Sequence, residues 1–358
     1  MRVGLVFGGR SVEHQVSVRS ARTIGEALQE AGYEVVPLGI GPDGGWLPRS
    51  VGERALAGEI DFLPESAGPV LSTFSELIDS GAEVLFPALH GTWGEDGTFQ
   101  GLCEMADLPY VGASVMASAV TMDKLLTKRL WEAAGIPVVD YKAVSKSDFE
   151  SQREQVLARL EPLPWPVFVK PSVGGSSVGV VRASDRDELR DALAQALELD
   201  DNALVERSVE GLELECPVMG YPDLEAAAVG EIRPGRDFYD YADKYLEDGA
   251  ELVIPAELEP GVAERLRGLA VEAFALVGGS GMARVDFLLE PPDRPFVNEV
   301  NTIPGFTSIS MFPKLWDEVG VSPPELVRRL VEGALARHRD RERIDQRIKA
   351  WLAELAAD

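Results

Sequence analysis

Hydrophobic and polar residues follow a strand–helix–strand pattern along the first third of the chain. The apolar runs "RVGLVFGG" and "YEVVPLGI" predict strands, and residues 12–31 between them fit a helix that Gly32 ends. The pattern then predicts a helix over "STFSELIDSG", a strand over "AEVLFPALHG", a helix near 97–106 and a short strand "PYVG". This alternation predicts a parallel sheet with helices on both faces.

The middle of the chain has a different pattern, in which several strands surround a glycine-rich loop. In "TMDKLLTKRLWEAAGI" the apolar residues recur at helical spacing, and Thr121 is the expected N-cap. The strands "VVDYKAV", "PVFVK", "GVVRA" and "ALVERSV" follow, with helices over 147–160 and 184–198. We therefore expect an N-terminal α/β domain over 1–120 and a central α+β domain over 121–210.

The last part of the chain, 211–358, is expected to form a third domain. Strands are predicted over "LELECPVMG", "LEAAAVG", "GMARVDFLLE" and "PFVNEVN", with a helix over 260–277. Residues 233–249 form a long polar loop with four aromatic residues, and such loops often act as lids. A terminal helix over 322–356 is rich in charge, which is typical of a solvated helix face.

Composition and charge narrow the class of partner. The 358-residue chain has a formal net charge of −26, which disfavours nucleic acid or an anionic membrane as its main partner. No apolar run is long enough to span a bilayer, and the first residues lack a signal-peptide pattern. Cys103 and Cys216 stand far apart in unlike surroundings, which favours neither a disulfide nor a zinc site and fits a reducing cytoplasm.

The stretch "FVKPSVGGSSVGVV" combines a lysine with closely spaced glycines. Pro171 favours an extended conformation at Lys170, so this lysine ends a strand. Gly174 and Gly175 allow backbone N–H groups to approach an anion closely. The stretch is thus a candidate phosphate-binding loop, with a glycine–serine hairpin as the alternative. Lys124, in the first turn of a helix, is either an exposed lysine or a second contact to phosphate bound at that helix end.

A group of acidic and amide residues near the C-terminal end is the strongest indication of a functional site in the sequence. Arg284 and Asp286 share one face of a predicted strand, and Glu299 and Asn301 share one face of the next. If the two strands pair, these side chains converge as a set of oxygen ligands that suits Mg²⁺. The alternative is a network of arginine and carboxylates on a sheet surface.

Two loops of the first domain carry further candidates. In "GGRSVEHQVSV" the dinucleotide-binding glycine spacing is absent, and Glu13 is suited to an ammonium group rather than to phosphate. His90 ends another strand at the same sheet edge, where open α/β sheets bind their ligands. Helix capping and turn hydrogen bonds are the alternative roles of these two residues.

Taken together, these motifs resemble those of the D-alanine–D-alanine ligases, a family of the ATP-grasp superfamily. The resemblance rests on "GGRSVEHQVS", "LHGTWGEDGTFQG", "TMDKLLTK", "VKPSVGGSSVGV", "DFYDYADKY", "RVDF" and "NEVNTIPGFTSIS". These motifs run in order from about residue 3 to residue 320. The resemblance implies an ATP-grasp fold of three domains, with ATP between the central and C-terminal ones.

The resemblance also implies residues for ATP and metal. The implied contacts to ATP are Lys124, Lys170 and Lys244 at the phosphates, Glu206 and the Val209 backbone at the adenine, and Glu213 at the ribose. The implied ligands of two Mg²⁺ ions, for which Mn²⁺ can substitute, are Asp286, Glu299 and Asn301. Ser208 departs from the family, because some relatives have an aromatic residue beside the adenine.

The implied amino-acid site lies next to the phosphates. The first D-alanine is held by Glu13, tied to Ser176 and Tyr245, with His90 near its carboxylate. The oxyanion is stabilised by Arg284 and the Gly305 amide, and the second carboxylate is held by Ser310 and the Met311 amide. The implied enzyme is a cytoplasmic homodimer that makes D-alanyl-D-alanine, ADP and phosphate through D-alanyl phosphate, for peptidoglycan precursors.

Three alternatives to this function remain at the level of sequence. A ligase of the same family that uses D-lactate or D-serine as second substrate is the nearest, and the pair Lys244–Tyr245 favours D-alanine instead. A nicotinamide-dependent dehydrogenase is suggested by the parallel sheet but lacks the glycine fingerprint. A nucleotide sensor without catalysis is the third alternative.

Overall fold

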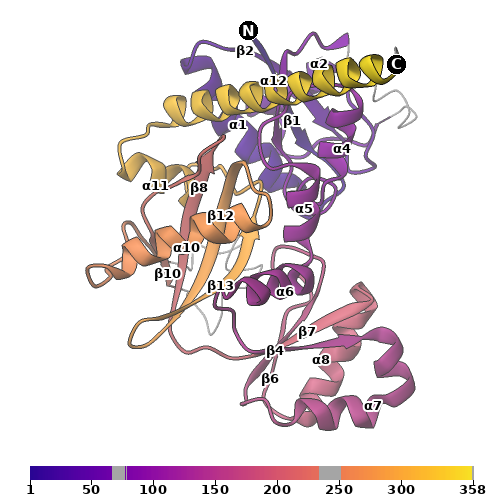
Figure 1. Ribbon diagram of the computed structural model, residues 1–358, viewed down its shortest axis with the longest axis vertical. Helices are drawn as coiled ribbons and strands as arrows, with labels where there is room; N and C mark the ends of the chain where they lie inside the picture. The colour runs from indigo at the N-terminus through magenta and orange to yellow at the C-terminus, as the bar shows by residue number, and fades with distance from the viewer. Residues whose placement is uncertain (67–76, 78, 234–250, 357–358) are drawn as a thin grey trace.

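The computed structural model describes residues 1–358 except 67–76, 78, 234–250 and 357–358. Its strands form three separate sheets that follow one another along the chain (Figure 1). The first sheet is parallel and the other two are antiparallel, which confirms the expected combination of α/β and α+β units. Each sheet falls within one of the three predicted segments, while the boundaries after residues 120 and 210 stay predictions.

The N-terminal sheet has the strand order β2–β1–β3. Its strands and the helices around it are β1 (Arg2–Gly8), α1 (His14–Glu30), β2 (Glu34–Ile40), α2 (Arg49–Leu56), β3 (Val84–Ala88), α4 (Thr98–Met105) and α12 (Pro323–Leu355). Side chains alternate along β1, so Leu5 and Phe7 pack with α1 and α12 while Val6 packs with α4. Phe7 lies opposite Ala88, and the loops after β1 and β3 therefore leave the same sheet edge together.

The central sheet has the order β4–β7–β5–β6. Its elements are β4 (Tyr141–Ser145), α7 (Lys146–Leu160), β5 (Val167–Pro171), β6 (Val181–Ala183), α8 (Arg186–Leu199) and β7 (Asn202–Arg207). Val167 and Val169 enter the core beneath α7 and α8. Because side chains alternate, Phe168 and Lys170 lie on the opposite face of β5, where they line a cleft. The glycine-rich loop joins β5 to the antiparallel β6, as a hairpin requires.

The third sheet has the order β11–β10–β8–β12–β13, with β9 beside β8. Its elements are β8 (Leu212–Gly220), β9 (Glu225–Ala226), β10 (Gly230–Arg233), β11 (Glu251–Val253), α10 (Val262–Leu276), β12 (Gly281–Glu290), β13 (Arg294–Asn301) and α11 (Met311–Glu318). Phe274 of α10 packs with Val285 and Phe287 of β12. Arg284 and Asp286 alternate with these residues and line the cleft on the other face.

Two helices, α5 (Val115–Met122) and α6 (Lys124–Ala134), replace the single helix predicted from residue 121. The prediction of Thr121 as an N-cap is wrong, because Thr121 lies in α5 and its hydroxyl donates to Ala117 O at 2.9 Å. Asp123 caps α6 instead, and its carboxylate accepts a hydrogen bond from Leu126 N at 3.0 Å.

Other predicted elements differ in detail from the structure. The predicted strand "PYVG" is reduced to an isolated bridge between Tyr110 and Leu85. The predicted strand "LEAAAVG" is split, with the two-residue β9 at one end and the start of β10 at the other. The sequence pattern did not predict α2 or α11. The predicted helix over 72–81 and loop over 233–249 fall largely on residues outside those described.

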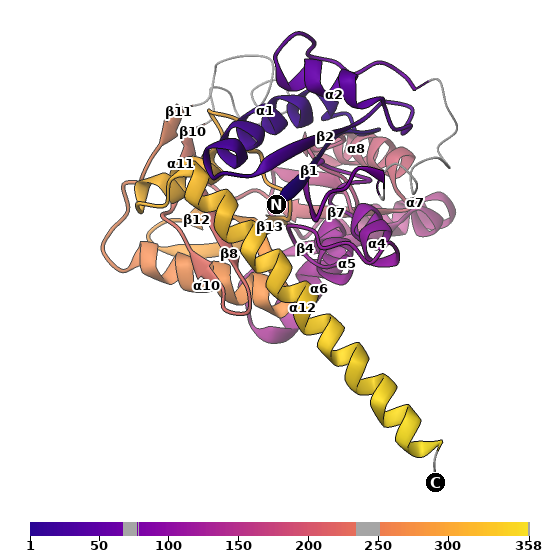
Figure 2. The same cartoon turned by 90° about the horizontal axis from the view of Figure 1, so that it is seen from above.

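The predicted terminal helix is confirmed as α12, which begins with prolines after Ser322. Leu326, Val327 and Leu330 pack in the same core as α1, whereas residues 341–356 are all exposed. Figure 2 shows this last stretch projecting beyond the rest of the molecule. None of the helices in the described part of the chain is long and apolar enough to cross a membrane.

Candidate active site

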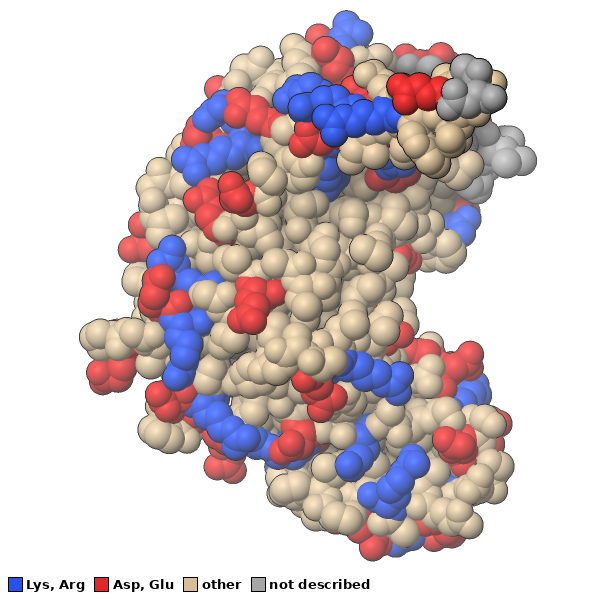
Figure 3. Space-filling model, in the orientation of Figure 1, with Lys and Arg blue, Asp and Glu red and all other residues tan. Residues whose placement is uncertain are grey.

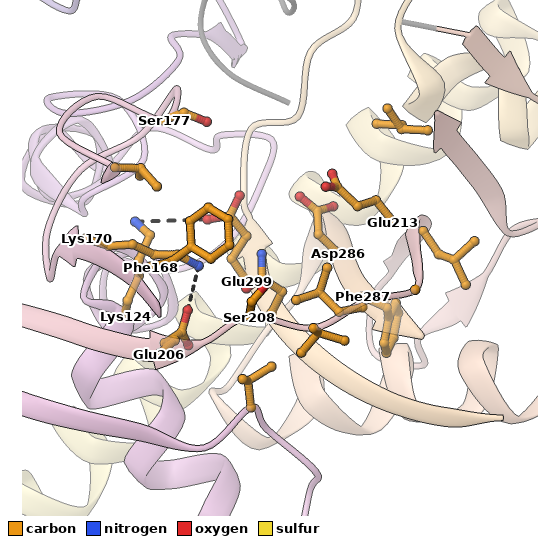
Figure 4. A pocket seen from close by; sticks show the side chains of 18 of the residues that line it. Lys124, Phe168, Lys170, Ser177, Glu206, Ser208, Glu213, Asp286, Phe287 and Glu299 are labelled. Carbon is orange, nitrogen blue, oxygen red and sulfur yellow. Dashed lines mark ion pairs between the residues drawn. The ribbon is translucent and has the colours of Figure 1, made fainter. Parts of the chain in front are cut away.

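A cleft of about 740 Å³ lies between the central and third sheets (Figure 4). One wall is formed by β5, β7 and the glycine-rich loop, and the other by β8, β12 and β13. The volume is within the range of ordinary small-molecule sites. The two walls carry charges of opposite sign.

The wall formed by the central sheet is basic. Lys170 lies near the end of β5, on the face that lines the cleft, and Lys124 is the first residue of α6. Lys124 is held against the glycine-rich loop, because its Nζ donates to Gly174 O at 2.6 Å and its backbone N–H donates to Ser172 O at 2.9 Å. The structure thus brings together both predicted phosphate-binding lysines and the predicted loop.

A buried carboxylate anchors this basic wall. The Glu206 oxygens lie 2.6 Å from Lys170 Nζ and 2.6 Å from Lys128 Nζ, and the Lys128 side chain is only 1% exposed. Burial alone would raise the pKa of Glu206, but the two ammonium groups outweigh it and hold that pKa at about 2. Glu206 is therefore a permanent carboxylate that fixes Lys170 at the cleft surface.

The cleft is also lined by the other residues expected near the nucleoside. Ser208, Val209 and Glu213 all line it, as the resemblance implies. Phe168 projects into the cleft from β5 (Figure 4), and Ser208 lies beside the start of that strand, with its N–H donating to Pro166 O at 3.0 Å. Some relatives have an aromatic side chain at the position of Ser208. In this chain Phe168 supplies an aromatic ring in the same cleft.

The wall formed by the third sheet is acidic. Asp286 of β12 lies directly opposite Glu299 of β13 and opposite Glu215 of β8. Arg284 partly neutralises this row, with Nε and Nη2 each 2.7 Å from an Asp286 oxygen and Nε 3.2 Å from Glu215. Asn301 donates from Nδ2 to Asp286 at 2.9 Å. The strand pairing that the sequence argument required is confirmed.

The donor set on this wall fits a magnesium ion shared with phosphate. Two carboxylates and one amide oxygen, from Asp286, Glu299 and Asn301, are hard ligands on adjacent strands. Among the described residues, no group of three or more His, Cys, Asp or Glu forms a complete metal cage. Mg²⁺ commonly takes only one or two protein carboxylates and completes its shell with substrate phosphates and water, so this smaller set is sufficient.

Glu13 lies where the first sheet meets the glycine-rich loop. It precedes α1, is buried, and lies so close to Gly91 that an added Cβ there would be 2.7 Å from its Oε2. A Cβ on Gly175 would lie 3.5 Å from the same oxygen. Glu13 is therefore adjacent to the loop that carries Ser176, which the resemblance assigns to the same substrate.

His90 links the first sheet to the loop that follows β13. Its Nδ1 lies 2.8 Å from Ile303 O and its Nε2 lies 2.9 Å from Ser20 Oγ. A carbonyl can only accept, so Nδ1 carries the proton and Nε2 accepts from the serine. Burial lowers the pKa of His90, which favours this neutral form.

Glu95 makes a second link to the same loop. Its two oxygens accept hydrogen bonds from Gly91 N at 2.7 Å and from Ile303 N at 2.8 Å. Burial, and then the charge of Glu13, raise the pKa of Glu95 to about 8. His90 and Glu95 together hold the polypeptide that leads to Gly305.

Gly305 and Ser310 lie close together in that loop. Ser310 Oγ accepts a hydrogen bond from Thr307 N at 3.0 Å, and a Cβ on Gly305 would lie 3.0 Å from the same oxygen. Ser310 is also the residue from which α11 starts, so the Met311 N–H lies at a helix N-terminus, where anionic groups are favoured. The structure thus brings the two predicted positions close together.

Two predicted residues, Lys244 and Tyr245, lie outside the described residues. Four residues of the cleft region were not predicted from sequence: Lys128, Glu215, Glu95 and Phe168. Glu95 lies in the motif "LHGTWGEDGTFQG", so an acid within a glycine-rich turn was the available signal. Glu215 shares a face with Glu213 on β8, and the period of two along the strand was the signal there.

Comparison with known proteins identifies the family. A family model described as the D-ala D-ala ligase N-terminus matches residues 2–113, and one described as its C-terminus matches residues 130–332. The D-alanine–D-alanine ligases of Mycobacterium ulcerans (strain Agy99) and Chloroherpeton thalassium (strain ATCC 35110 / GB-78) are 44% and 42% identical. These alignments cover 94% and 95% of this chain, and 96% and 98% of the relatives.

Two solved structures are similar along nearly the whole chain. The D-alanine–D-alanine ligase from Coxiella burnetii has a TM-score of 0.82 and 33% identity, with 99% of each chain covered. The VanG D-Ala:D-Ser ligase from Enterococcus faecalis has a TM-score of 0.78 and 31% identity, with 93% of this chain and 99% of the other covered. The chain therefore belongs to the D-alanine–D-alanine ligase family.

Proposed function

We propose that this protein joins two D-alanine molecules with ATP, forming D-alanyl-D-alanine, ADP and phosphate for peptidoglycan precursors. The observation that carries the proposal is the arrangement of the cleft. A basic wall faces an acidic wall, and the residues expected to hold amino acids, Glu13 and His90, come from the edge of the first sheet. Family membership supports both substrates.

In the first step, the carboxylate of one D-alanine attacks the γ-phosphate of ATP, and ADP leaves with the electrons of the broken P–O bond. Lys124 and Lys170 offset the negative charge that gathers between these anions. Glu206 orients Lys170 for this role through the ion pair described above. We assign Lys244 to the same phosphates because of the family resemblance.

Asp286, Glu299 and Asn301 would hold Mg²⁺, and we propose two ions, with Mn²⁺ able to substitute. When bound, the metal supplies positive charge that neutralises the phosphate oxygens facing the acidic wall. Arg284 lies against Asp286 and Glu215 and reduces the repulsion among the carboxylates of this wall.

In the second step, the amine of the second D-alanine attacks the carbonyl carbon of D-alanyl phosphate. A C–N bond forms, the amine gives up a proton, and phosphate leaves with the electrons of the C–O bond. Arg284 and the Gly305 N–H would stabilise the oxyanion, and loss of one such donor typically costs about 3 kcal/mol. Asp286 fixes the orientation of the Arg284 guanidinium through two hydrogen bonds.

The amino-acid site is proposed to form around Glu13, His90 and Ser310. The Glu13 carboxylate would bind the ammonium of the first D-alanine, together with Ser176 and Tyr245. Neutral His90 would lie near the carboxylate of that substrate, and Ser310 with the Met311 N–H would hold the carboxylate of the second. Glu213 and the Val209 backbone are assigned to the ribose and adenine. A homodimer in the cytoplasm stays a prediction.

The decisive experiment measures ADP release with D-alanine, D-serine or D-lactate as second substrate, with and without Mg²⁺. We expect turnover to require Mg²⁺ and to be fastest with D-alanine at neutral pH. D-serine is the specific competitor, because the VanG structure is a D-Ala:D-Ser ligase and resembles this chain. Faster turnover with D-serine or D-lactate would replace the proposed second substrate, and no ATP turnover with any of them would overturn the proposal.

A further inference from the structure

The last four turns of α12 carry an apolar strip that the described part of the chain does not cover. Every residue from 341 to 356 is exposed. The exposed fractions of Ile344, Ile348, Trp351 and Leu355 are 56%, 49%, 59% and 55%. The match to the family models ends at residue 332, before this stretch begins. Large exposed apolar side chains in a contiguous strip indicate an interaction surface.

The spacing of the strip is that of a helix that packs against another helix. The apolar residues are separated by four, three and four positions, which is the alternation of the a and d sites in a heptad. Ile344 and Trp351 take d sites, and Ile348 and Leu355 take a sites. Leu352, which is 53% exposed, widens the strip beside Trp351.

We propose that this projecting helix pairs with the same helix of a second copy, antiparallel and related by a two-fold axis. In the pairing that buries the whole strip, Ile348 packs against Trp351 of the second copy and Ile344 against Leu355 of the second copy. Because of the two-fold axis, each of these two contacts occurs twice in the dimer, as in an isologous interface.

The length of the projecting stretch fits this register. Residues 341–355 extend over about 22 Å of helix. Since residue 344 pairs with residue 355, the helix of the second copy ends beside Ile344, before the point at which α12 packs onto its own core. The neighbouring registers either leave Ile344 uncovered or bring Leu355 against the body of the other copy.

Charges beside the strip favour the antiparallel direction. Arg347 and Glu354 both occupy g sites, and g sites face each other in an antiparallel pair. Arg347 of each copy therefore meets Glu354 of the other, twice per dimer. A parallel pair would bring Asp340 against Asp345 of the second copy, which is repulsive, and would leave Arg347 opposite Leu352.

The same strip is less well suited to an anionic membrane. Helices that lie on such membranes are basic on their polar face. Figure 3 shows Lys and Arg side chains gathered along α12, but most basic residues of that helix precede Ile344. Between 344 and 355, Arg347 and Lys349 are balanced by Asp345 and Glu354, and the whole chain has a net charge of −26.

The first test is the mass of the full chain in solution over a concentration series, by analytical ultracentrifugation. The double variant I348E/W351E should lower the association state of the wild type, because it places four carboxylates per dimer in the apolar seam. The matched control is Lys349→Glu, which makes the same change of net charge per chain, −2, on the outer face of the same helix and should leave the mass distribution unchanged. Identical mass distributions for wild type and I348E/W351E would overturn the proposal.

A charge exchange tests the direction of the pair. Arg347→Glu alone and Glu354→Arg alone should each weaken association about fivefold, since each variant turns two ion pairs into two repulsions. The double variant R347E/E354R should restore it, because the pairs reform with exchanged charges. A double variant as weak as the singles would exclude the antiparallel register.

Two further measurements separate this surface from the active site and from a lipid surface. ADP release per chain should be the same in all these variants, because the strip lies outside the residues that line the cleft. Flotation with phosphatidylglycerol–phosphatidylcholine vesicles should recover none of the protein. Vesicle binding that I348E/W351E abolishes, together with a wild type whose mass does not change with concentration, would identify a membrane contact and overturn the pairing.

Discussion

The two walls of the cleft neutralise their charges in different ways. On the basic wall, Glu206 is buried between Lys128 and Lys170, and its pKa is held at about 2. On the acidic wall, Asp286 and Glu299 line the open cleft, and Arg284 and Lys124 lie within ion-pair distance of them. The first cluster is closed and complete, whereas the second is open to a ligand.

This difference indicates how each wall is suited to bind phosphate. A lysine fixed by a buried carboxylate presents its charge to an anion without rearrangement. A wall of carboxylates repels phosphate unless a cation lies between them, so its function depends on a metal ion. Changes to the acidic wall should therefore act on turnover, and changes to the buried cluster should act on stability.

Removal of a carboxylate from the acidic wall should have the largest effect. We expect Glu299→Ala to lower Mg²⁺-dependent ADP release by roughly 10³-fold, since charge stabilisation at the reacting phosphate is lost. The melting temperature should stay close to that of the wild type. Glu259→Ala, which removes an exposed acid after β11, is the matched control. Unchanged turnover in Glu299→Ala would remove this residue from the metal site.

Removal of the buried lysine should lower the stability of the fold more than it lowers turnover. Lys128→Met leaves Glu206 with one cation in place of two, and breaking a buried ion pair costs about 3 kcal/mol or more. Urea denaturation measures this loss in the free energy of unfolding. Lys142→Met, at an exposed position on β4, should have almost no effect. Equal stability of the two variants would show that Lys128 does not support the basic wall.

Glu95, which links the loop after β3 to the loop after β13, should make stability depend on pH. Its folded pKa of about 8 is above the ordinary value of 4.5, so its contribution is complete below pH 4.5 and is lost as pH rises through 8. Glu95→Gln does not titrate at this position. Between pH 5 and 8 the free energy of unfolding of the wild type should therefore fall by on the order of 3 kcal/mol more than that of the variant. Parallel pH profiles in urea titrations would contradict this assignment.

The smallest expected effect concerns the apolar part of the basic wall. Phe168→Ala should raise the KM for ATP about tenfold, because stacking of a base on an aromatic ring is worth about 1–2 kcal/mol. The KM for D-alanine should change little. If instead the KM for D-alanine rises and that for ATP does not, the nucleoside lies elsewhere in the cleft.

The positions of site residues that follow from the two-residue period of a strand were predictable from sequence. The positions of those that follow from tertiary packing were not. Asp286 and Glu299 were placed together because two regular strands with a period of two leave few alternatives. Lys128 gave no such signal, since a lysine on an amphipathic helix ordinarily faces water. Its burial depends on the position of α6 against Glu206, which no local pattern encodes.

The N-cap of α6 is a second example. Thr121 and Asp123 are both good capping residues, and local sequence does not choose between them. The choice follows from α5, which ends at Met122 and leaves Asp123 in an extended conformation. The bridge between Asp123 and Val173 then ties this cap to the glycine-rich loop. The error of two residues in sequence thus arose because a separate helix, α5, precedes α6.

The links from His90 and Glu95 to Ile303 have a consequence for synthesis of the chain. They join positions more than 200 residues apart in sequence, and the loop they hold precedes only α11 and α12. A chain still emerging from the ribosome can fold the central sheet early, because the core of that sheet is formed by residues between 144 and 205. It cannot assemble the amino-acid end of the cleft until nearly the last helix has been made. Truncated products of translation are therefore expected to lack ligase activity even when most of the molecule has folded.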